Sequence, residues 1–193
     1  CMVAILENAI ARFTGSGIDP VPIGNRHPSI APFTSVRTAD GYINIACGND
    51  ALWLKLCEII ERSDLATDKR YESNRSRCDH MPDLLPQLND AMHRQPSAYW
   101  LKKLEEGHVP AGPINTISQV LSDPQVLARN MLLELAHPVA GMVKVPGSPV
   151  KLSDTPAEVK APAPVLGQHN DEILASLGYS AQQIEGFRAE AVI

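Results

Sequence analysis

Residues 24–50 constrain the fold more than any other part of this chain, because they combine a loop, a hairpin and a helix start in one short segment, GNRHPSIAPFTSVRTADGYINIACGND. Within it, residues 33–37 and 42–47 carry the β-branched and aromatic side chains that are typical of strands. The residues between them, 38–41, end in Asp-Gly, a pair that favours positive φ in tight turns. The segment therefore predicts an antiparallel hairpin in which the pair Asp40-Gly41 supplies the positive φ of the turn.

A helix is expected directly after this hairpin. Asn49 or Asp50 caps its start, and the helix runs to about Glu61. Apolar side chains recur at helical spacing along one face. They are Leu52, Leu56, Ile59 and Ile60, with Trp53 beside them. This face is expected to pack on the hairpin and give a small α+β body, and the polar stretch 62–80 that follows is expected to be mostly loop with one helix start.

Later signals extend this body. Residues 97–106 predict a helix closed by Gly107, and Pro86 is expected to kink or delay the helix before it. A second hairpin is predicted around Gly141. Capping signals mark three further helix starts, which are Thr116 with Gln119, Asp123 before Pro124, and Ser180 with Gln183.

Two proline-rich stretches divide the chain. Residues 18–32 contain four prolines and one glycine, which exclude regular structure and give a stiff, extended connector. Prolines are frequent again over residues 146–164. Ahead of the first connector, residues 1–13 are apolar around nearly the whole circumference of a helix, the pattern of a buried helix. The predicted divisions are residues 1–31, 32–145 and 146–193.

Composition and charge exclude several classes of protein. A net charge of −5 without a Lys/Arg cluster argues against a nucleic acid partner. No apolar run reaches the roughly 18 residues of a transmembrane helix, so no membrane span is predicted. Cys1, Cys47, Cys57 and Cys78 lack paired spacing, and isolated histidines such as His108 lack ligand spacing. We therefore expect free thiols in a reducing cytoplasm and no metal site.

Four segments carry a resemblance to a known family: GNRHPSIAPF, TADGYINIACGN, VPAGPINT, and LSDTP followed by APVLGQHNDEIL. Together they resemble the C-terminal half of family III CoA-transferases, the CaiB/BaiF-like superfamily of formyl-CoA transferases and acyl-CoA racemases. Members are much longer than 193 residues, so the chain is expected to be a fragment. The resemblance implies a small α+β domain with flanking helices that belong to a Rossmann-like α/β large domain, in an interlocked homodimer.

The resemblance also implies a reaction. In this family an aspartate attacks a coenzyme A thioester, and the resulting anhydride exchanges CoA between carboxylic acids. By the family pattern that aspartate lies upstream of Cys1, so no catalytic residue is assigned in this chain and the fragment alone is expected to be inactive. Coenzyme A enters as a substrate thioester, and the implied partners are acyl-CoA and carboxylic acids, with no metal, in the cytoplasm.

The candidate site residues are Gly24, Asn25, Arg26 and His27, which match a loop that is a run of glycines in some family members and closes over the active aspartate. Here the loop is not glycine-rich. Arg26 is suited to hold a substrate carboxylate by a bidentate contact, and His27 to donate a hydrogen bond or shuttle a proton. The alternative is that both residues fix the connector and contact the dimer partner.

Two other functions remain open. The same resemblance allows an acyl-CoA racemase or epimerase, in which an upstream His and carboxylate exchange the α-proton. The third possibility is a non-catalytic dimerisation or binding module. An apolar first helix without a covering partner would then be expected to self-associate.

Overall fold

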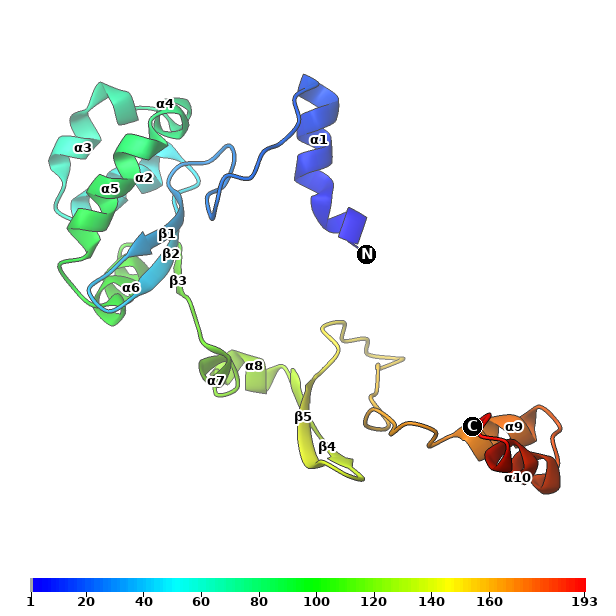
Figure 1. The fold of residues 1–193 in the computed structure, drawn as a ribbon. Helices are drawn as coiled ribbons and strands as arrows, with labels where there is room; N and C mark the ends of the chain where they lie inside the picture. The colour runs from blue at the N-terminus through cyan, green and yellow to red at the C-terminus, as the bar shows by residue number, and fades with distance from the viewer. Residues whose placement is uncertain (1) are drawn as a thin grey trace. The chain divides into compact units, whose positions relative to one another are not determined.

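The computed structural model describes residues 2–193. The chain folds as two compact units, Cys1–Ile114 and Asn115–Ile193 (Figure 1). Cys1, which the sequence predicts as a free thiol, lies outside the described residues. The boundary between the units falls inside the predicted 32–145 domain, whose limits stay a prediction for the whole protein.

In the first unit two adjacent strands are followed by a run of helices and a third strand, and in the second unit two pairs of helices flank a pair of strands. The first unit contains η1 Met2–Leu6, α1 Glu7–Ser16, β1 Phe33–Arg37, β2 Tyr42–Ala46, α2 Asp50–Ile59, α3 Ser63–Thr67, η2 Lys69–Tyr71, α4 Asn74–Asp79, α5 Met81–Met92, α6 Ser97–Glu106 and β3 Ala111–Pro113. The second contains α7 Ile117–Val120, α8 Pro124–Ala128, β4 Leu132–His137, β5 Gly141–Pro146, α9 Asn170–Ser176 and α10 Ala181–Ala189.

The predicted first hairpin is confirmed. Strands β1 and β2 pair antiparallel, with Phe33 opposite Ala46, and β3 pairs with β2 on its other side. The positive φ expected of the Asp-Gly pair is wrong, since neither Asp40 nor Gly41 is among the residues with left-handed backbone. The reversal is instead spread over four residues, closed by a 2.9 Å hydrogen bond from the Thr38 N–H to the Gly41 carbonyl. No left-handed residue is needed in a turn of this kind.

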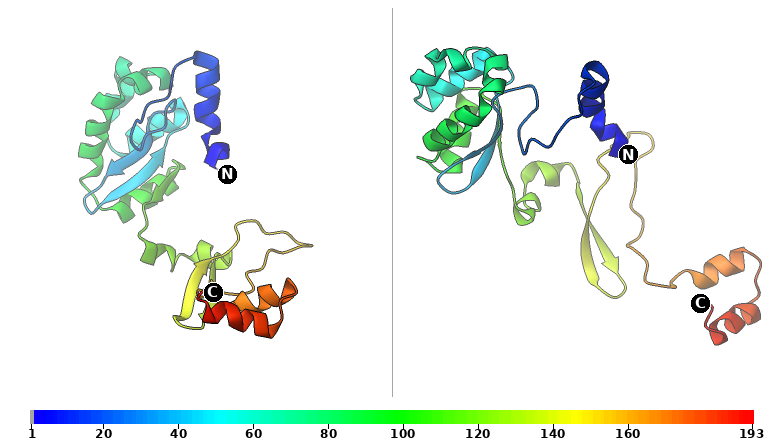
Figure 2. Two further views of the ribbon diagram at one scale, coloured as in Figure 1. Left: turned by 45° about the vertical axis from the view of Figure 1, so that its right-hand side comes forward. Right: turned by 45° about the horizontal axis from the view of Figure 1, so that its top comes forward.

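The core of the first unit lies between the sheet and helices α2, α5 and α6. Asn49 caps α2 as predicted, because its side chain accepts a hydrogen bond of 2.9 Å from the Leu52 N–H. Val36, Ile43 and Ile45 of the strands are fully buried. The buried side chains of these helices include Trp53, Leu56, Leu84, Leu88, Met92 and Trp100, and Ile60 just after α2 is also buried. In both views of Figure 2 the cyan and green helices lie beside the blue strands.

The stretch 62–80 differs from its prediction as mostly loop, because it forms α3, η2 and α4. Each of these elements is a single short helix, below the length at which apolar periodicity is informative. The next helix, α5, contains Pro86 in its interior and still runs through to Met92. Its apolar face at Leu84, Leu88 and Met92 is fully buried, and this packing outweighs the cost of the proline.

The first helix is almost entirely exposed, and only Ala9 is half-buried. Helix α1 ends at the left-handed Gly17, as the sequence predicts, but none of its residues is buried. Ile5 is 70% exposed and Phe13 45% exposed. The expected burial is not seen, because the described residues supply no surface that covers this helix. Along residues 2–193, no helix combines the length and apolar character that crossing a bilayer requires.

The second unit confirms the local signals of the sequence. Capping boxes open α7 at Thr116 and α10 at Ser180, and Asp123 caps α8 ahead of its first proline. Strands β4 and β5 form the second hairpin, with Gly141 at a φ of 73°. Gly178, at a φ of 92°, follows the end of α9.

Candidate functional site

The 24–27 loop, made of Gly24, Asn25, Arg26 and His27, is tied to the first strand by two of its four residues. The Asn25 side-chain amide donates to the Ser35 hydroxyl, and the His27 N–H donates to the Phe33 carbonyl at 2.8 Å. Gly24 has a left-handed φ of +73°, and a Cβ at this position would meet no atom within 4 Å. Backbone conformation rather than crowding therefore favours glycine there.

The His27 ring is used structurally. It stacks on Phe33 with the ring centres 5.3 Å apart and the planes 12° from parallel. Its Nδ1 accepts a 3.2 Å hydrogen bond from the Ser29 N–H, so a neutral His27 carries its proton on Nε2. These contacts match the alternative in which His27 fixes the connector, and they leave only Nε2 for a polar contact with a substrate.

Arg26 differs from both neighbours. Its side chain is exposed and forms no hydrogen bond or ion pair with any residue in the described part of the chain. Burial raises the pKa of the Cys78 thiol on α4, and the positive charge of Arg26 is among the charges that oppose this rise. The guanidinium of Arg26 is therefore close enough to α4 to act on it electrostatically, and its donors remain available for a ligand.

Helix α4 is hydrogen-bonded to the connector just beyond the 24–27 loop. Asn74, the first residue of α4, accepts a 3.0 Å hydrogen bond from the Ala31 N–H at Oδ1. Its Nδ2 donates a 2.8 Å hydrogen bond to the Ser29 carbonyl. Ser73 holds the start of the helix by accepting from the Ser76 N–H at 3.2 Å. One side chain thus satisfies two backbone groups of a segment that has no regular structure of its own.

A second residue of α4, Arg77, is buried beneath the same connector. Its side chain is fully buried and donates from Nε to the Ala31 carbonyl at 2.7 Å. Its two terminal nitrogens donate to the Tyr71 carbonyl at 2.9 Å and to Asp50 at 2.6 Å, and the guanidinium lies 5.3 Å from the ring centre of Trp53. A buried guanidinium is stable only with such partners.

Sequence reasoning missed Asn74 and Arg77. Both lie in the polar stretch expected to be mostly loop, where arginines and asparagines suggest solvent exposure. The one available signal was Ser73 ahead of a short polar run, which is a capping pattern. It marks a helix start but does not identify what the helix holds.

Asp40, Ser97 and His93 bring together the residue types of a nucleophilic triad, but their geometry is structural. Asp40 accepts from the Ser97 N–H at 2.7 Å and from the Ser97 hydroxyl at 2.8 Å. The hydrogen bond from the Ser97 backbone is the main reason why the pKa of Asp40 is lowered. His93 is bonded through Nδ1 to the Thr38 carbonyl at 2.9 Å rather than to Ser97. The cluster therefore ties the hairpin turn to the start of α6.

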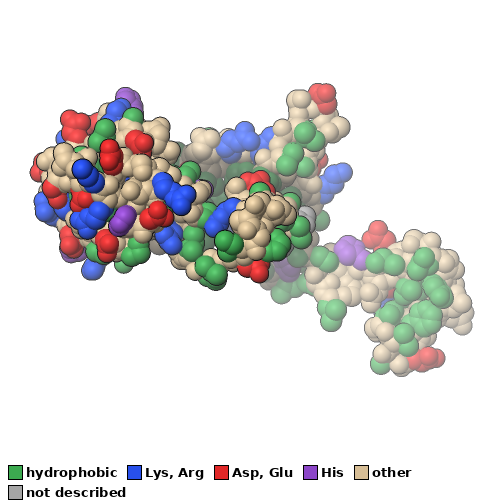
Figure 3. Space-filling view, turned by 90° about the horizontal axis from the view of Figure 1, so that it is seen from above, with side chains coloured by type: hydrophobic (Ala, Val, Ile, Leu, Met, Phe, Trp, Pro, Cys, Tyr) green, Lys and Arg blue, Asp and Glu red, His purple; other side chains and the backbone are tan. Residues whose placement is uncertain are grey.

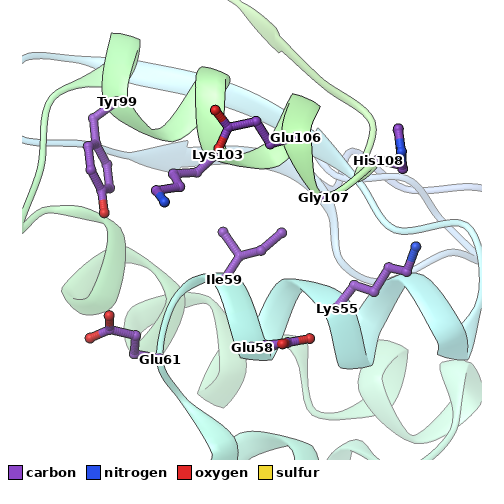
Figure 4. Close-up of a pocket in the computed structure, with 9 residues that line it drawn as sticks. All are labelled: Lys55, Glu58, Ile59, Glu61, Tyr99, Lys103, Glu106, Gly107 and His108. Atoms are coloured by element: carbon purple, nitrogen blue, oxygen red, sulfur yellow. The ribbon is translucent and has the colours of Figure 1, made fainter.

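A surface pocket of about 490 Å³ lies between α2 and α6 (Figure 4). Ile59 projects toward its centre, and both signs of charge surround it. The charged residues of its lining are Lys55, Glu58, Glu61, Lys103 and Glu106, and His108 and Tyr99 also line it. Three glutamates and two lysines place both signs of charge around the pocket, and the 24–27 loop does not contribute to its lining.

Metal and thiol chemistry receive no support from the described residues. Among residues 2–193, no three His, Cys, Asp or Glu side chains come together in a way that would hold a metal ion. Burial raises the pKa of both Cys47 and Cys57 to about 12, which keeps these thiols protonated. On the face shown in Figure 3, acidic and basic side chains are interspersed rather than gathered by sign.

Comparison with known proteins gives a consistent result. Residues 1–170 match the CoA-transferase family III. The chain is 34% identical over 174 residues to the succinate–glutarate CoA-transferase of Agrobacterium fabrum, covering 90% of this chain and 44% of that protein. It is 39% identical to the acetyl-CoA:oxalate CoA-transferase of Acetobacter aceti, covering 81% of this chain and 39% of that one.

Solved structures agree with this match. A CaiB/BaiF family protein from Brucella suis superposes with a TM-score of 0.74 at 34% identity, covering 92% of this chain and 46% of that protein. The chain thus spans less than half the length of the relatives it resembles.

Proposed function

Because this chain belongs to CoA-transferase family III, we propose that the protein of which it is part moves CoA between carboxylic acids. The observation that carries the proposal is the match over residues 1–170. The similar proteins are named as transferases acting on succinate, glutarate, oxalate and mesaconate, all dicarboxylic acids. We therefore assign a short dicarboxylic acid as the CoA acceptor.

The proposed reaction uses a carboxylate nucleophile outside this chain. An aspartate attacks the acyl-CoA carbonyl, the C–S bond breaks, and CoA leaves as a thiolate, so that the acyl group is bound to the aspartate as a mixed anhydride. The thiolate then attacks the aspartyl carbonyl and releases the first acid. The same two steps then run in reverse with the acceptor. Its carboxylate attacks the aspartyl-CoA thioester and displaces the thiolate, and the thiolate attacks the acceptor carbonyl of the new anhydride and frees the aspartate. Coenzyme A takes part as a substrate thioester, and no metal is required.

The proposed architecture places the rest of the protein around this chain. Residues 1–31 and 146–193 return to a Rossmann-like large domain, and residues 32–145 form the small domain of a cytoplasmic, interlocked homodimer. The support is twofold: the chain covers only 44% of its succinate–glutarate relative, and the apolar side chains of α1 are exposed. The fragment alone is expected to be inactive.

Within this architecture, the 24–27 loop faces the substrates and Arg26 binds the acceptor carboxylate. Asn25 and His27 are occupied by contacts with the first strand. Arg26, between them, is exposed and has its donors available. A guanidinium binds a carboxylate through two parallel hydrogen bonds, which gives orientation as well as affinity.

The test is CoA exchange by the full-length protein. Succinyl-CoA is supplied as donor with glutarate or oxalate as acceptor, and the new thioester is identified by mass spectrometry. Formation of the acceptor thioester is the expected result. Exchange of the α-proton with deuterated water in the absence of an acceptor would point to a racemase, and absence of both reactions would favour the non-catalytic module.

A further inference from the structure

Ser29 connects α4 to the candidate site through two backbone hydrogen bonds. Its carbonyl accepts the 2.8 Å hydrogen bond from Asn74. Its N–H donates the 3.2 Å hydrogen bond to the Nδ1 of His27. A single residue of the connector is therefore held on one side by a helix and on the other by the residue that follows Arg26.

Further contacts hold the connector on both sides of Ser29. Asn74 and Arg77 fix the N–H and the carbonyl of Ala31, respectively. Toward the loop, the His27 N–H is bonded to the Phe33 carbonyl and the ring is stacked on Phe33. Every hydrogen bond in this chain of contacts lies inside the first unit, so the fold of that unit alone determines the backbone next to Arg26.

We propose that Asn74 and Arg77 are positioning residues, which hold the connector so that Arg26 presents its guanidinium to the acceptor carboxylate. The proposal rests on the proposed function of the 24–27 loop. Neither residue touches the substrate in this account, because both side chains are occupied by the connector and its neighbours.

These contacts order the connector when the protein folds, so less conformational entropy is lost when substrate binds. A loop that must order when substrate binds loses affinity for that substrate, whereas a loop already fixed in the folded protein does not. Loss of the contacts of Asn74 and Arg77 with the connector is therefore expected to raise the KM for the carboxylate acceptor. The kcat is expected to stay nearly unchanged, because the reacting groups lie elsewhere.

Asn74→Ala is the variant of choice, since loss of the buried Arg77 can unfold the unit. The matched control is Asn89→Ala. Asn89 also holds a backbone group of the first unit, because its Oδ1 accepts from the Arg37 N–H at 2.8 Å. That contact lies at the far end of β1 from the loop. Asn74→Ala loses two asparagine-to-backbone hydrogen bonds and Asn89→Ala loses one, and only Asn74→Ala loses contact with the connector.

The first measurement does not depend on activity. Trypsin cleaves the Arg26–His27 bond of the full-length protein only when the connector opens, and the peptide that results is followed by mass spectrometry. Asn74→Ala is expected to speed this cleavage about tenfold, while Asn89→Ala leaves it within about twofold of wild type. Equal cleavage rates in the two variants would overturn the proposal.

The second measurement is a double-mutant cycle on the KM for the acceptor. Asn74→Ala alone is expected to raise this KM about tenfold, and in an Arg26→Gln background it is expected to raise it no further. Additive effects of the two substitutions would show that Asn74 does not act through Arg26 and would overturn the positioning role. Absence of CoA transfer in the wild type would overturn the proposed function, and the cleavage rates would still decide whether Asn74 holds the connector.

Discussion

The Nε of Arg77 donates a 2.7 Å hydrogen bond to the carbonyl oxygen of Ala31, 46 residues earlier in the chain. The same guanidinium reaches the Tyr71 carbonyl and the carboxylate of Asp50. One buried side chain thus joins the connector, the end of η2 and the first turn of α2. Arg77 is therefore expected to contribute to the stability of the first unit as well as to the placement of the loop.

Arg77→Met is expected to lower the free energy of unfolding by roughly 2–4 kcal/mol, because two backbone carbonyls lose charged donors and Met supplies none. Urea denaturation of the full-length protein measures the change. Arg75→Met is the matched control on the same helix. Arg75 is 91% exposed and lies 3.5 Å from Asp79, so its loss is expected to cost no more than about 1 kcal/mol. Equal losses in both variants would contradict the structural role of Arg77.

The lowered pKa of Asp40, in the turn of the first hairpin, predicts that the stability of the folded protein depends on pH. Hydrogen bonds from Ser97 lower the pKa of Asp40 below its usual value of 3.8. Its contribution to stability is therefore fully present above the unfolded pKa and is lost as the pH falls through the lower, folded pKa. Asp40→Asn keeps an acceptor oxygen but does not titrate.

Thermal melting of wild type and Asp40→Asn over about pH 5 to pH 2 tests this dependence. Wild type is expected to be the more stable of the two near pH 5, because an ionised acceptor binds the first N–H of α6 more strongly than an amide does. This advantage is expected to disappear toward the acid end. A difference in melting temperature that stays constant over the whole range would show that Asp40 does not contribute in this way.

The two cysteines in the core of the first unit are expected to resist alkylation. Cys47 and Cys57 are fully buried, and burial raises the pKa of each to about 12. At about pH 8 almost no thiolate is present, and the reagent has no access to the sulfur. Peptide mapping after treatment with iodoacetamide is expected to show neither cysteine modified in the folded protein and both modified in urea. Rapid modification in the folded state would mean that the core opens readily.

Sequence signals that act over a few residues predicted the structure well. The hairpin at residues 33–46, the Asn49 cap and the capping boxes at Thr116 and Ser180 are all present. Each depends on a hydrogen bond or strand pairing between residues close in sequence, so the residue types alone encode it. The wrong φ expected of the Asp-Gly pair shows the limit of this reasoning, because Asp40 is held by the distant Ser97 as well as by Thr38 of its own turn.

The sequence proposed the candidate site as a segment, but it did not predict how the residues of that segment are held. The resemblance placed residues 24–27 together, and the structure separates the anchored Asn25 and His27 from the exposed Arg26. The contribution of Asn74 was not predictable, since it depends on a contact between residues 45 positions apart. Contact of Arg26 with a substrate remains a prediction.

The most direct test of the account is the KM for the acceptor in full-length wild type and Arg26→Gln, measured by CoA transfer from succinyl-CoA to a dicarboxylic acid. Loss of a charge-assisted contact worth about 1.5–3 kcal/mol is expected to raise the KM for the acceptor roughly 10- to 100-fold, with little change in the KM for the acyl-CoA donor. Arg75→Gln, which removes an exposed arginine of α4, is expected to behave as wild type. An unchanged KM for the acceptor in Arg26→Gln would contradict the claim that the 24–27 loop presents Arg26 to the substrate.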